Sequence, residues 1–163
     1  MKSLLIGVPV IVLSLILFSF QHDSNLNRHY LNELRVTCEE ASVAGATFID
    51  SREYSEGRIV FNKTESLKAI EAIIKESLFL DSYMRPVNVS YWTDQVTYKA
   101  YFYDDSNTTY PDFFTDEDTG FTYVVKSPTV IVTINAGKAP YRLSFLKNLG
   151  SNMRSAAHVW EGR

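Results

Sequence analysis

The first feature of the chain is an uninterrupted apolar stretch near its start. Residues 4–20 read LLIGVPVIVLSLILFSF, in which only Ser14 and Ser19 carry polar side chains. A helix that crosses a bilayer needs about 20 apolar residues, with a lower limit of about 17. The pattern predicts a membrane anchor over residues 1–21 and one further domain over residues 22–163. The side chains expected to contact lipid are Leu4, Leu5, Ile6, Val8, Val10, Ile11, Val12, Leu13, Leu15, Ile16, Leu17, Phe18 and Phe20.

The end of this stretch favours a retained anchor over a cleaved signal peptide. A signal peptide ends in a small-residue triplet of the A-x-A kind. Residues 18–23 instead read FSFQHD, in which Ser19 stands between two Phe residues. A buried helix of a soluble core is a third alternative, which the absence of any charge over this length disfavours.

The charges beside the anchor leave its orientation nearly balanced, because Lys2 precedes it while Arg28 and Arg35 follow it. A short N-terminal tail ahead of a large domain favours export of that domain. The net charge of −3 is also compatible with export. We expect a single-pass protein of the cell membrane whose C-terminal domain lies outside the cytoplasm.

Two amphipathic helices are predicted after the anchor. The first covers residues 22 to about 48, where apolar side chains recur every three or four positions. No Pro or Gly separates it from the anchor, so the two could form one helix, although residues 23–25 offer a break and a fresh N-cap. The second begins at Asn62, a capping residue with Glu65 three positions later, and ends before Pro86.

Small residues crowd the end of the first helix. Ala41, Ala44 and Gly45 recur at helical spacing, which allows another backbone to approach closely. These residues are a candidate helix-packing interface. They face either a neighbouring membrane protein or the sheet of this same chain.

The rest of the chain has the period-two pattern of strands. Polar residues fill the loop 104–120, and the tail 148–163 has only weak periodicity. This order predicts an α+β fold, in which amphipathic helices pack on an antiparallel sheet of four to five strands. The predicted strands are a short one at 58–61, a hairpin of 87–92 with 96–103, and three more at 121–126, 129–135 and 141–146.

Composition excludes some function classes. The chain has 163 residues, of which 45% are hydrophobic and 21% charged, as in ordinary globular proteins. It has no cluster of Lys and Arg to bind phosphates, so we expect no nucleic-acid partner. A single cysteine excludes a disulfide framework and a cysteine-rich zinc site.

Candidate chemistry is sparse. The acidic residues at 104–105, 112 and 116–118 could bind Ca²⁺, but the spacing of an EF-hand is missing and we expect a solvated loop. Cys38 lies on the apolar stripe of a predicted helix and is expected to be buried and inert. The nucleotide, hydrolase and metalloprotease motifs are absent. We therefore expect no enzyme activity and no cofactor.

Four segments carry a family resemblance: EEASVAGA at 39–46, GRIVFN at 57–62, VKSPTVIV at 125–132 and RSAAHVW at 154–160. Together they resemble TadE-like minor pilins and assembly proteins of the tight-adherence pilus, which is related to type IV pili. The resemblance implies an N-terminal apolar helix that enters a filament or stays in the membrane and carries an exported α+β head. It also implies other membrane-anchored or pilin-like proteins as partners.

The chain departs from this family at the processing site. Peptidase-cleaved pilins have a Gly that is followed by an apolar run with Glu at its fifth position. In this chain the fifth residue after Gly7 is Val12. An unprocessed relative that serves in assembly fits this departure.

Two functions thus remain open: a structural or assembly component of a pilus or secretion-type envelope machine, and a membrane-anchored extracytoplasmic ligand-binding module. A continuous helix from anchor to head favours the first, and an exposed aromatic sheet face favours the second.

Overall fold

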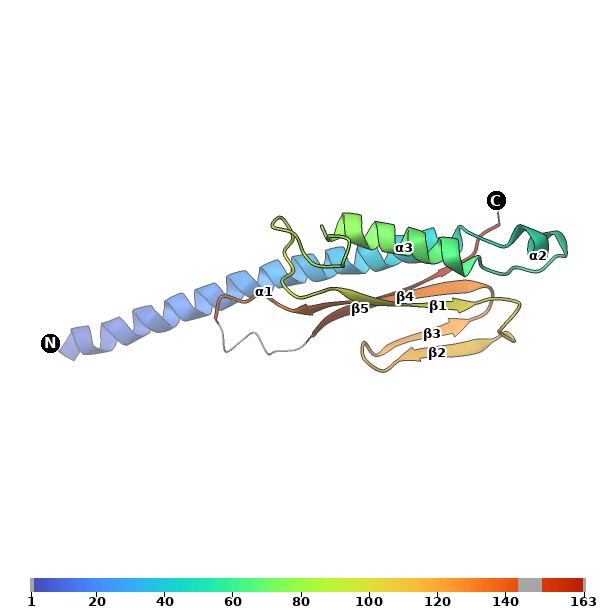
Figure 1. Cartoon of the computed structure of the whole chain (residues 1–163). Coiled ribbons are helices and arrows are strands. Elements are labelled where there is room, and N and C mark those ends of the chain that lie inside the picture. Colours follow the sequence, from blue (N-terminus) through green and yellow to red (C-terminus); the bar gives the residue numbers. More distant parts are fainter. Residues whose placement is uncertain (1, 144–150, 163) are drawn as a thin grey trace.

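One long helix dominates the molecule. A computed structural model gives the structure and describes residues 2–143 and 151–162, with side chains from residue 7 onward. Helix α1, Lys2–Ala46, has 45 residues and includes Pro9. Residues 23–25 are helical, so the predicted alternative of a break there is wrong. The N-terminal part of α1 projects from the head, and its C-terminal part packs within it (Figure 1).

Two further helices follow α1. Helix α2, Ser51–Ser55, is a single short turn that is capped by the Asp50 carboxylate. Helix α3, Lys63–Ser77, starts where the capping pattern predicts, because the Asn62 side chain accepts a hydrogen bond from the Glu65 N–H at 3.3 Å. It ends well before Pro86, since residues 78–96 form an irregular loop.

The strands form two antiparallel sheets rather than the single sheet of four to five strands that the sequence predicts. Strands β1 (Thr97–Tyr103), β4 (Thr129–Lys138) and β5 (Ser151–Val159) form a three-stranded sheet in the order β1-β4-β5. Strands β2 (Asp112–Asp116) and β3 (Phe121–Val125) form a separate hairpin. The α+β class and the antiparallel pairing are confirmed.

Several predicted strands need correction. Residues 87–92 are not a strand, and residues 58–61 contribute only an isolated bridge between Ile49 and Phe61. Of the strand predicted at 141–146, residues 141–143 are not a strand and 144–146 lie outside the described residues. Strand β2 lies in the predicted polar loop, and β5 lies in the tail.

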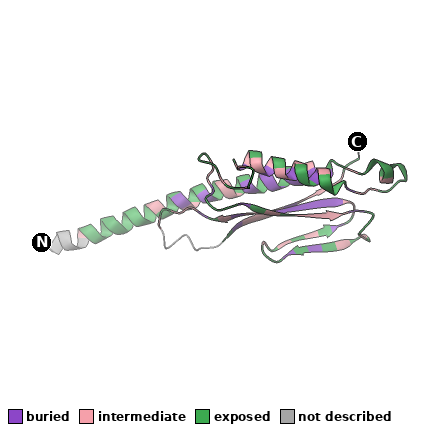
Figure 2. Cartoon of the chain, viewed as in Figure 1, coloured by how far each residue is buried: buried purple, intermediate pink, exposed green. Residues whose placement is uncertain are grey.

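The three-stranded sheet is covered on both faces. Helices α1 and α3 lie over one face and the β2–β3 hairpin lies below the other (Figure 1). Alternate residues of β4 serve the two sides: Val130 and Val132 belong to the core under the helices, and Ile131 packs with Phe114 and Val125 of the hairpin. Burial is therefore concentrated between these layers, while the projecting part of α1 is exposed (Figure 2).

Candidate functional site

The projecting part of α1 is the first candidate functional surface. It is long and apolar enough to cross a membrane, and its most apolar 18-residue window is only 6% buried. This is consistent with a single-pass anchor or with a signal sequence. Leu4, Leu5 and Ile6 are helical, and their side chains lie outside the described residues. The described anchor side chains are all exposed: Val8, Val10, Ile11, Val12, Leu13, Leu15, Ile16, Leu17, Phe18 and Phe20.

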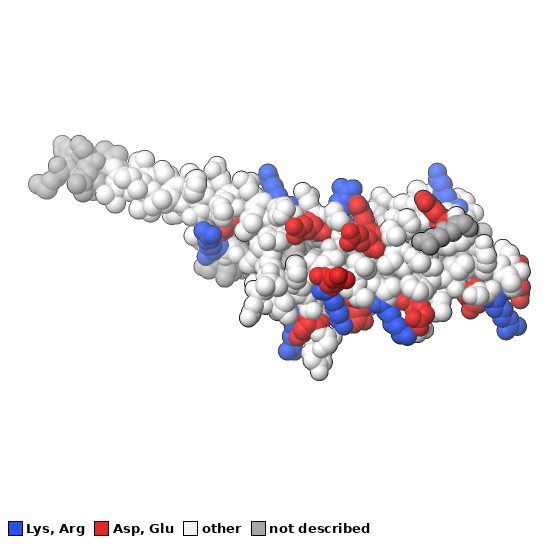
Figure 3. Space-filling model, turned by 90° about the horizontal axis from the view of Figure 1, so that it is seen from above, with Lys and Arg blue, Asp and Glu red and all other residues white. Residues whose placement is uncertain are grey.

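Charged side chains are also distributed unevenly between the head and the projecting part of α1. Seen from above, Lys, Arg, Asp and Glu of both signs gather on the head, and none marks the described projecting part on that face (Figure 3). The Ser14 hydroxyl in this part donates to the carbonyl of Val10 at 2.8 Å, so the helix itself satisfies this polar group. The exposed surface of the projecting helix is therefore apolar and suited to lipid or to neighbouring apolar helices.

A polar cluster fixes α1 where it enters the head. The buried Asp23 carboxylate accepts a hydrogen bond from the Arg142 N–H at 2.8 Å and lies 3.6 Å from the Arg142 guanidinium. One turn later Asn27 donates to Asn152 of β5 at 3.3 Å and accepts from the Tyr91 hydroxyl at 3.3 Å. The Tyr91 ring stacks on Tyr30, with ring centroids 3.9 Å apart. These contacts hold the projecting helix in a fixed direction from the head.

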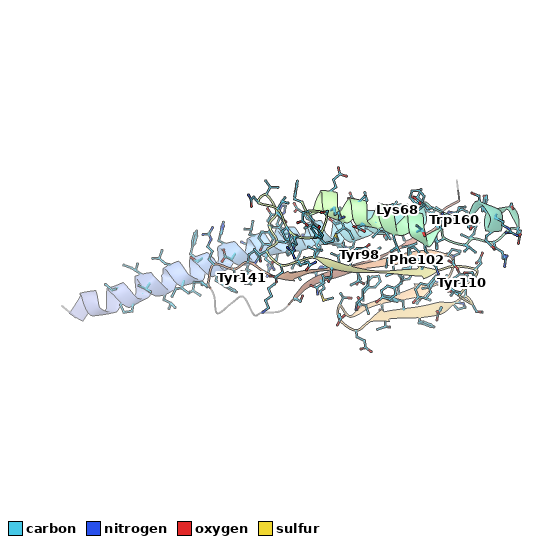
Figure 4. The ribbon with its side chains drawn as sticks, viewed as in Figure 1. Lys68, Tyr98, Phe102, Tyr110, Tyr141 and Trp160 are labelled. Carbon is cyan, nitrogen blue, oxygen red and sulfur yellow. The ribbon has the colours of Figure 1, made fainter. Side chains whose placement is uncertain are left out.

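Tyr91 is also electrostatically perturbed at this junction. Burial raises the pKa of its hydroxyl to about 12, with further contributions from Tyr141 and Asp23. Figure 4 shows Tyr141 beside α1, where that helix leaves the head. The Tyr91 hydroxyl therefore stays protonated and remains a hydrogen-bond donor to Asn27 at any physiological pH.

The small residues at the end of α1 pack inside the head. Ala41 and Gly45 are buried, while Ala44 is half-buried. A Cβ atom on Gly45 would lie 2.7 Å from Cδ1 of Ile70 on α3 and 3.1 Å from Cγ1 of Val130 on β4. The close approach that the sequence indicates thus occurs between α1, α3 and β4 of one chain.

A groove beside α1 is the second candidate surface. It has a volume of about 590 Å³ and runs along β5, the edge strand of the three-stranded sheet. A second hollow of about 550 Å³ continues past it, since both are lined by Val43 and His158. The walls of the first groove come from α1, β3 and β5 and include Arg35, Glu39, Ser42, Phe121, Tyr123 and Ser155.

Three polar side chains of this groove, Arg35, Glu39 and Ser155, already have partners. The Arg35 guanidinium lies 3.0 Å from the Glu39 carboxylate. The Ser155 hydroxyl donates to the Asp116 carboxylate at 3.0 Å. This arrangement supplies a surface for binding rather than an activated nucleophile and base.

Two of the acidic residues considered as Ca²⁺ ligands, Asp104 and Asp116, are structural, so the expectation of a solvated loop is wrong for them. Asp104 is fully buried and accepts hydrogen bonds from the N–H groups of Phe61 and Ser106. Asp116 is 7% exposed and accepts from the Thr133 hydroxyl at 2.8 Å. In residues 2–143 and 151–162 no group of three or more His, Cys, Asp or Glu residues could hold a metal ion.

The hydrogen bonds to Asp116 also set its ionisation. Burial alone would raise the pKa of this carboxyl group, but the Thr133 and Ser155 hydroxyls and the Asp118 N–H lower it below its ordinary value. The charged carboxylate therefore joins the hairpin to β4 and β5. Sequence reasoning missed this role because the partners come from distant strands.

Cys38 is buried, as predicted. Its thiol donates to the carbonyl of Arg154 at 3.2 Å, and burial raises its pKa to about 12. A thiol in this state is a weak nucleophile. Cys38 is therefore a core residue that joins α1 to β5.

In comparisons with known proteins, no family model, curated protein or solved structure matches the chain.

Proposed function

We propose that the chain is a single-pass, membrane-anchored structural or assembly component of a bacterial pilus or secretion-type envelope machine, with its head outside the cytoplasm. The TadE-like resemblance supports this proposal through the segments at 39–46, 57–62, 125–132 and 154–160. An α+β head on one end of a long apolar helix is the architecture which that resemblance implies.

The observation that carries the proposal is the continuity of α1. One helix runs from Lys2 to Ala46, and the contacts of Asp23, Asn27 and Tyr30 fix its direction relative to the head. Its projecting part exposes large apolar side chains that nothing in the described chain covers. Such a surface needs lipid or other apolar helices. A rigid connection fixes the position of the head relative to the membrane, as an assembly component requires.

The interior of the head supports a structural role over catalysis. The buried groups Asp104, Asp116 and Cys38 each form hydrogen bonds with residues that are distant in the sequence. The fifth residue after Gly7 is Val12, whereas peptidase-cleaved pilins have Glu at that position. We therefore propose an unprocessed component that assists assembly and has no enzyme activity of its own.

In-cell crosslinking along α1 tests this role. A photoreactive residue replaces Val12 or Ile16 on the projecting helix, and Leu67, an exposed residue of α3, provides the control position. The proposal predicts crosslinks from the α1 positions to a second copy or to another single-anchor protein, identified by mass spectrometry. Only uncrosslinked monomer at both α1 positions would contradict it.

The groove along β5 favours a second candidate function, an anchored ligand-binding module. Its volume of about 590 Å³ is within the range of ligand sites. The aromatic side chains of β1 do not form an open binding face, because Tyr101 and Tyr103 pack against Phe114 of the hairpin. Replacement of Ala157 by Trp fills the groove, and loss of function in cells with normal anchor crosslinks would support this second candidate.

A further inference from the structure

The loop between α3 and β1 lies at the end of the head from which α1 projects (Figure 1). This loop, residues 78–96, is held there by the stacking of Tyr91 on Tyr30 of α1. Its inner side chains Trp92 and Val96 are buried in the core under the helices. One side of the loop is thus part of the fold, and its position beside the exit of α1 is fixed.

The outer side of this loop is unusually apolar. Phe79, Tyr83, Val87 and Val89 are 55%, 72%, 42% and 73% exposed. These are four large apolar side chains within eleven residues. The sequence pattern predicts that the two Val residues lie in a strand, but the loop turns both of them outward. The outer surface of the loop, at the end of the head from which α1 projects, is therefore apolar.

The backbone is strained where it presents one of these side chains. Phe79 has φ of 54°, in the left-handed region that favours glycine. It follows the C-cap of α3, where the Leu80 N–H donates to the Lys75 carbonyl at 2.9 Å in the manner of a Schellman motif. Glycine is the usual residue at this position. A bulky aromatic residue that is both strained and exposed indicates a role outside the fold.

The charges of this region suit a membrane surface. Arg85 in the loop and Arg28 on α1 are exposed and form no ion pair with any residue that the structure describes. The buried carboxylate of Asp23 is paired with Arg142, and the Asp81 carboxylate accepts the N–H groups of Tyr83 and Arg85. Unpaired cations beside exposed aromatic and aliphatic side chains are typical of the membrane interface.

We propose that the loop Phe79–Val89 rests in the headgroup region of the same bilayer that holds α1, with Phe79, Tyr83, Val87 and Val89 in contact with lipid. This inference rests on the proposed anchoring of α1. Lipid is the expected occupant because the apolar surface lies at the end of the head from which the apolar helix projects (Figure 1). Tyr at the headgroup level and Arg toward the phosphates are the usual interfacial arrangement. The contact would set the tilt of the head above the membrane.

Fluorescence quenching of the full chain in lipid vesicles tests this contact. Cysteine replaces Tyr83, Val89, Ile16 or Phe113, one at a time, and is labelled with an environment-sensitive dye. Cys38 is buried and unreactive, so it stays in place. Phe113 is the matched control, because it is 74% exposed but lies on the β2–β3 hairpin. The vesicles contain phosphatidylcholine and phosphatidylglycerol, with or without lipids that carry a nitroxide quencher.

The loop proposal predicts blue-shifted emission at positions 83 and 89 and quenching several times stronger than at position 113. Position 16 reports separately on the anchor. Strong quenching at 16 together with emission at 83 and 89 like that at 113 would overturn the loop proposal and leave the anchoring intact. Absence of quenching at 16 would overturn the anchoring and the loop proposal with it.

Discussion

Gly45 of α1 faces Ile70 of α3 so closely that an added Cβ on Gly45 would lie 2.7 Å from Ile70 Cδ1. Real Cβ atoms do not approach other atoms so closely, and Val130 closes the other side at 3.1 Å. An added methyl group at this position would therefore have to displace the side chains of Ile70 and Val130.

The first prediction concerns this contact. At a solvent-exposed position inside a helix, Gly→Ala stabilises the protein by about 1 kcal/mol. At Gly45 we expect the substitution to destabilise the chain instead, by about 1–3 kcal/mol, through overpacking. Ile70→Val removes the Cδ1 atom and should recover part of this loss in the double variant. Chemical denaturation of the full chain in detergent measures the cycle.

Ile74→Val provides the control for this cycle, since Ile74 is equally buried on α3 but is not among the nearest neighbours of Gly45. Additive effects of Gly45→Ala and Ile70→Val would contradict the packing explanation. So would stabilisation by Gly45→Ala alone.

The second prediction concerns Asp116. Its carboxylate accepts hydrogen bonds from the Thr133 and Ser155 hydroxyls, so Asp116→Asn should destabilise the chain by about 1–3 kcal/mol at pH 7. The pKa of Asp116 is lower in the folded chain than its unfolded value of about 3.9, so its charge stabilises the fold above that pH. The difference in the free energy of unfolding between the variant and the unaltered chain should therefore become smaller as the pH falls below about 4.

Asp118 is the matched control for Asp116, because its exposed carboxylate lies 3.3 Å from Lys99. An exposed ion pair contributes about 0–1 kcal/mol, so Asp118→Asn should have little effect. Thermal melts across pH compare the two variants. Equal melting temperatures for both variants and the unaltered chain would show that Asp116 is not the structural link described above.

The third prediction concerns Tyr110. Its hydroxyl is buried and has no hydrogen-bond partner among the described residues. Burial, followed by the charges of Asp105 and Asp104, raises the pKa of this hydroxyl. Figure 4 shows Tyr110 near the end of β1 that lies away from the projecting helix. Because an unsatisfied polar group costs about 1–3 kcal/mol, Tyr110→Phe should leave stability unchanged or raise it by about 1 kcal/mol.

Tyr91→Phe is the comparison, since it removes the 3.3 Å hydrogen bond to Asn27. It should cost about 0.5–1.5 kcal/mol. A clear loss of stability in Tyr110→Phe would reveal a partner for that hydroxyl.

The fourth prediction concerns the strain at Phe79. With φ of 54°, glycine suits the position better than alanine, so Phe79→Gly should be more stable than Phe79→Ala by about 1 kcal/mol. At Val89, which has no positive φ, the order should reverse. Unfolding of the four variants in detergent compares the two sites. The same order at both sites would exclude backbone strain at Phe79.

The sequence predicts the helices better than the sheet. Asn62 caps α3 as predicted, and Leu34, Cys38 and Ala41 of the apolar stripe on α1 are buried as its period requires. Local capping and periodicity determine both features. The small-residue pattern predicts close packing at Gly45, but its partner on α3 is determined by tertiary structure.

The missed strands show where local pattern fails. Strand β5, Ser151–Val159, contains small and polar residues and is ordered by its pairing with β4. Strand β2 has only two apolar residues, Phe113 and Phe114, and depends on β3. Residues 87–92 have strand-like alternation, yet they form a loop in which Tyr91 stacks on Tyr30 of α1.

The membrane topology of the full chain tests the central proposal most directly. Alkaline phosphatase fused after residue 163 is active only outside the cytoplasm, and sequencing of the mature N-terminus shows whether α1 is retained. We predict an active fusion that stays in the membrane fraction after alkaline extraction, with a mature chain that includes residues 4–20. An inactive fusion, or a mature chain that begins near Gln21, would contradict the account.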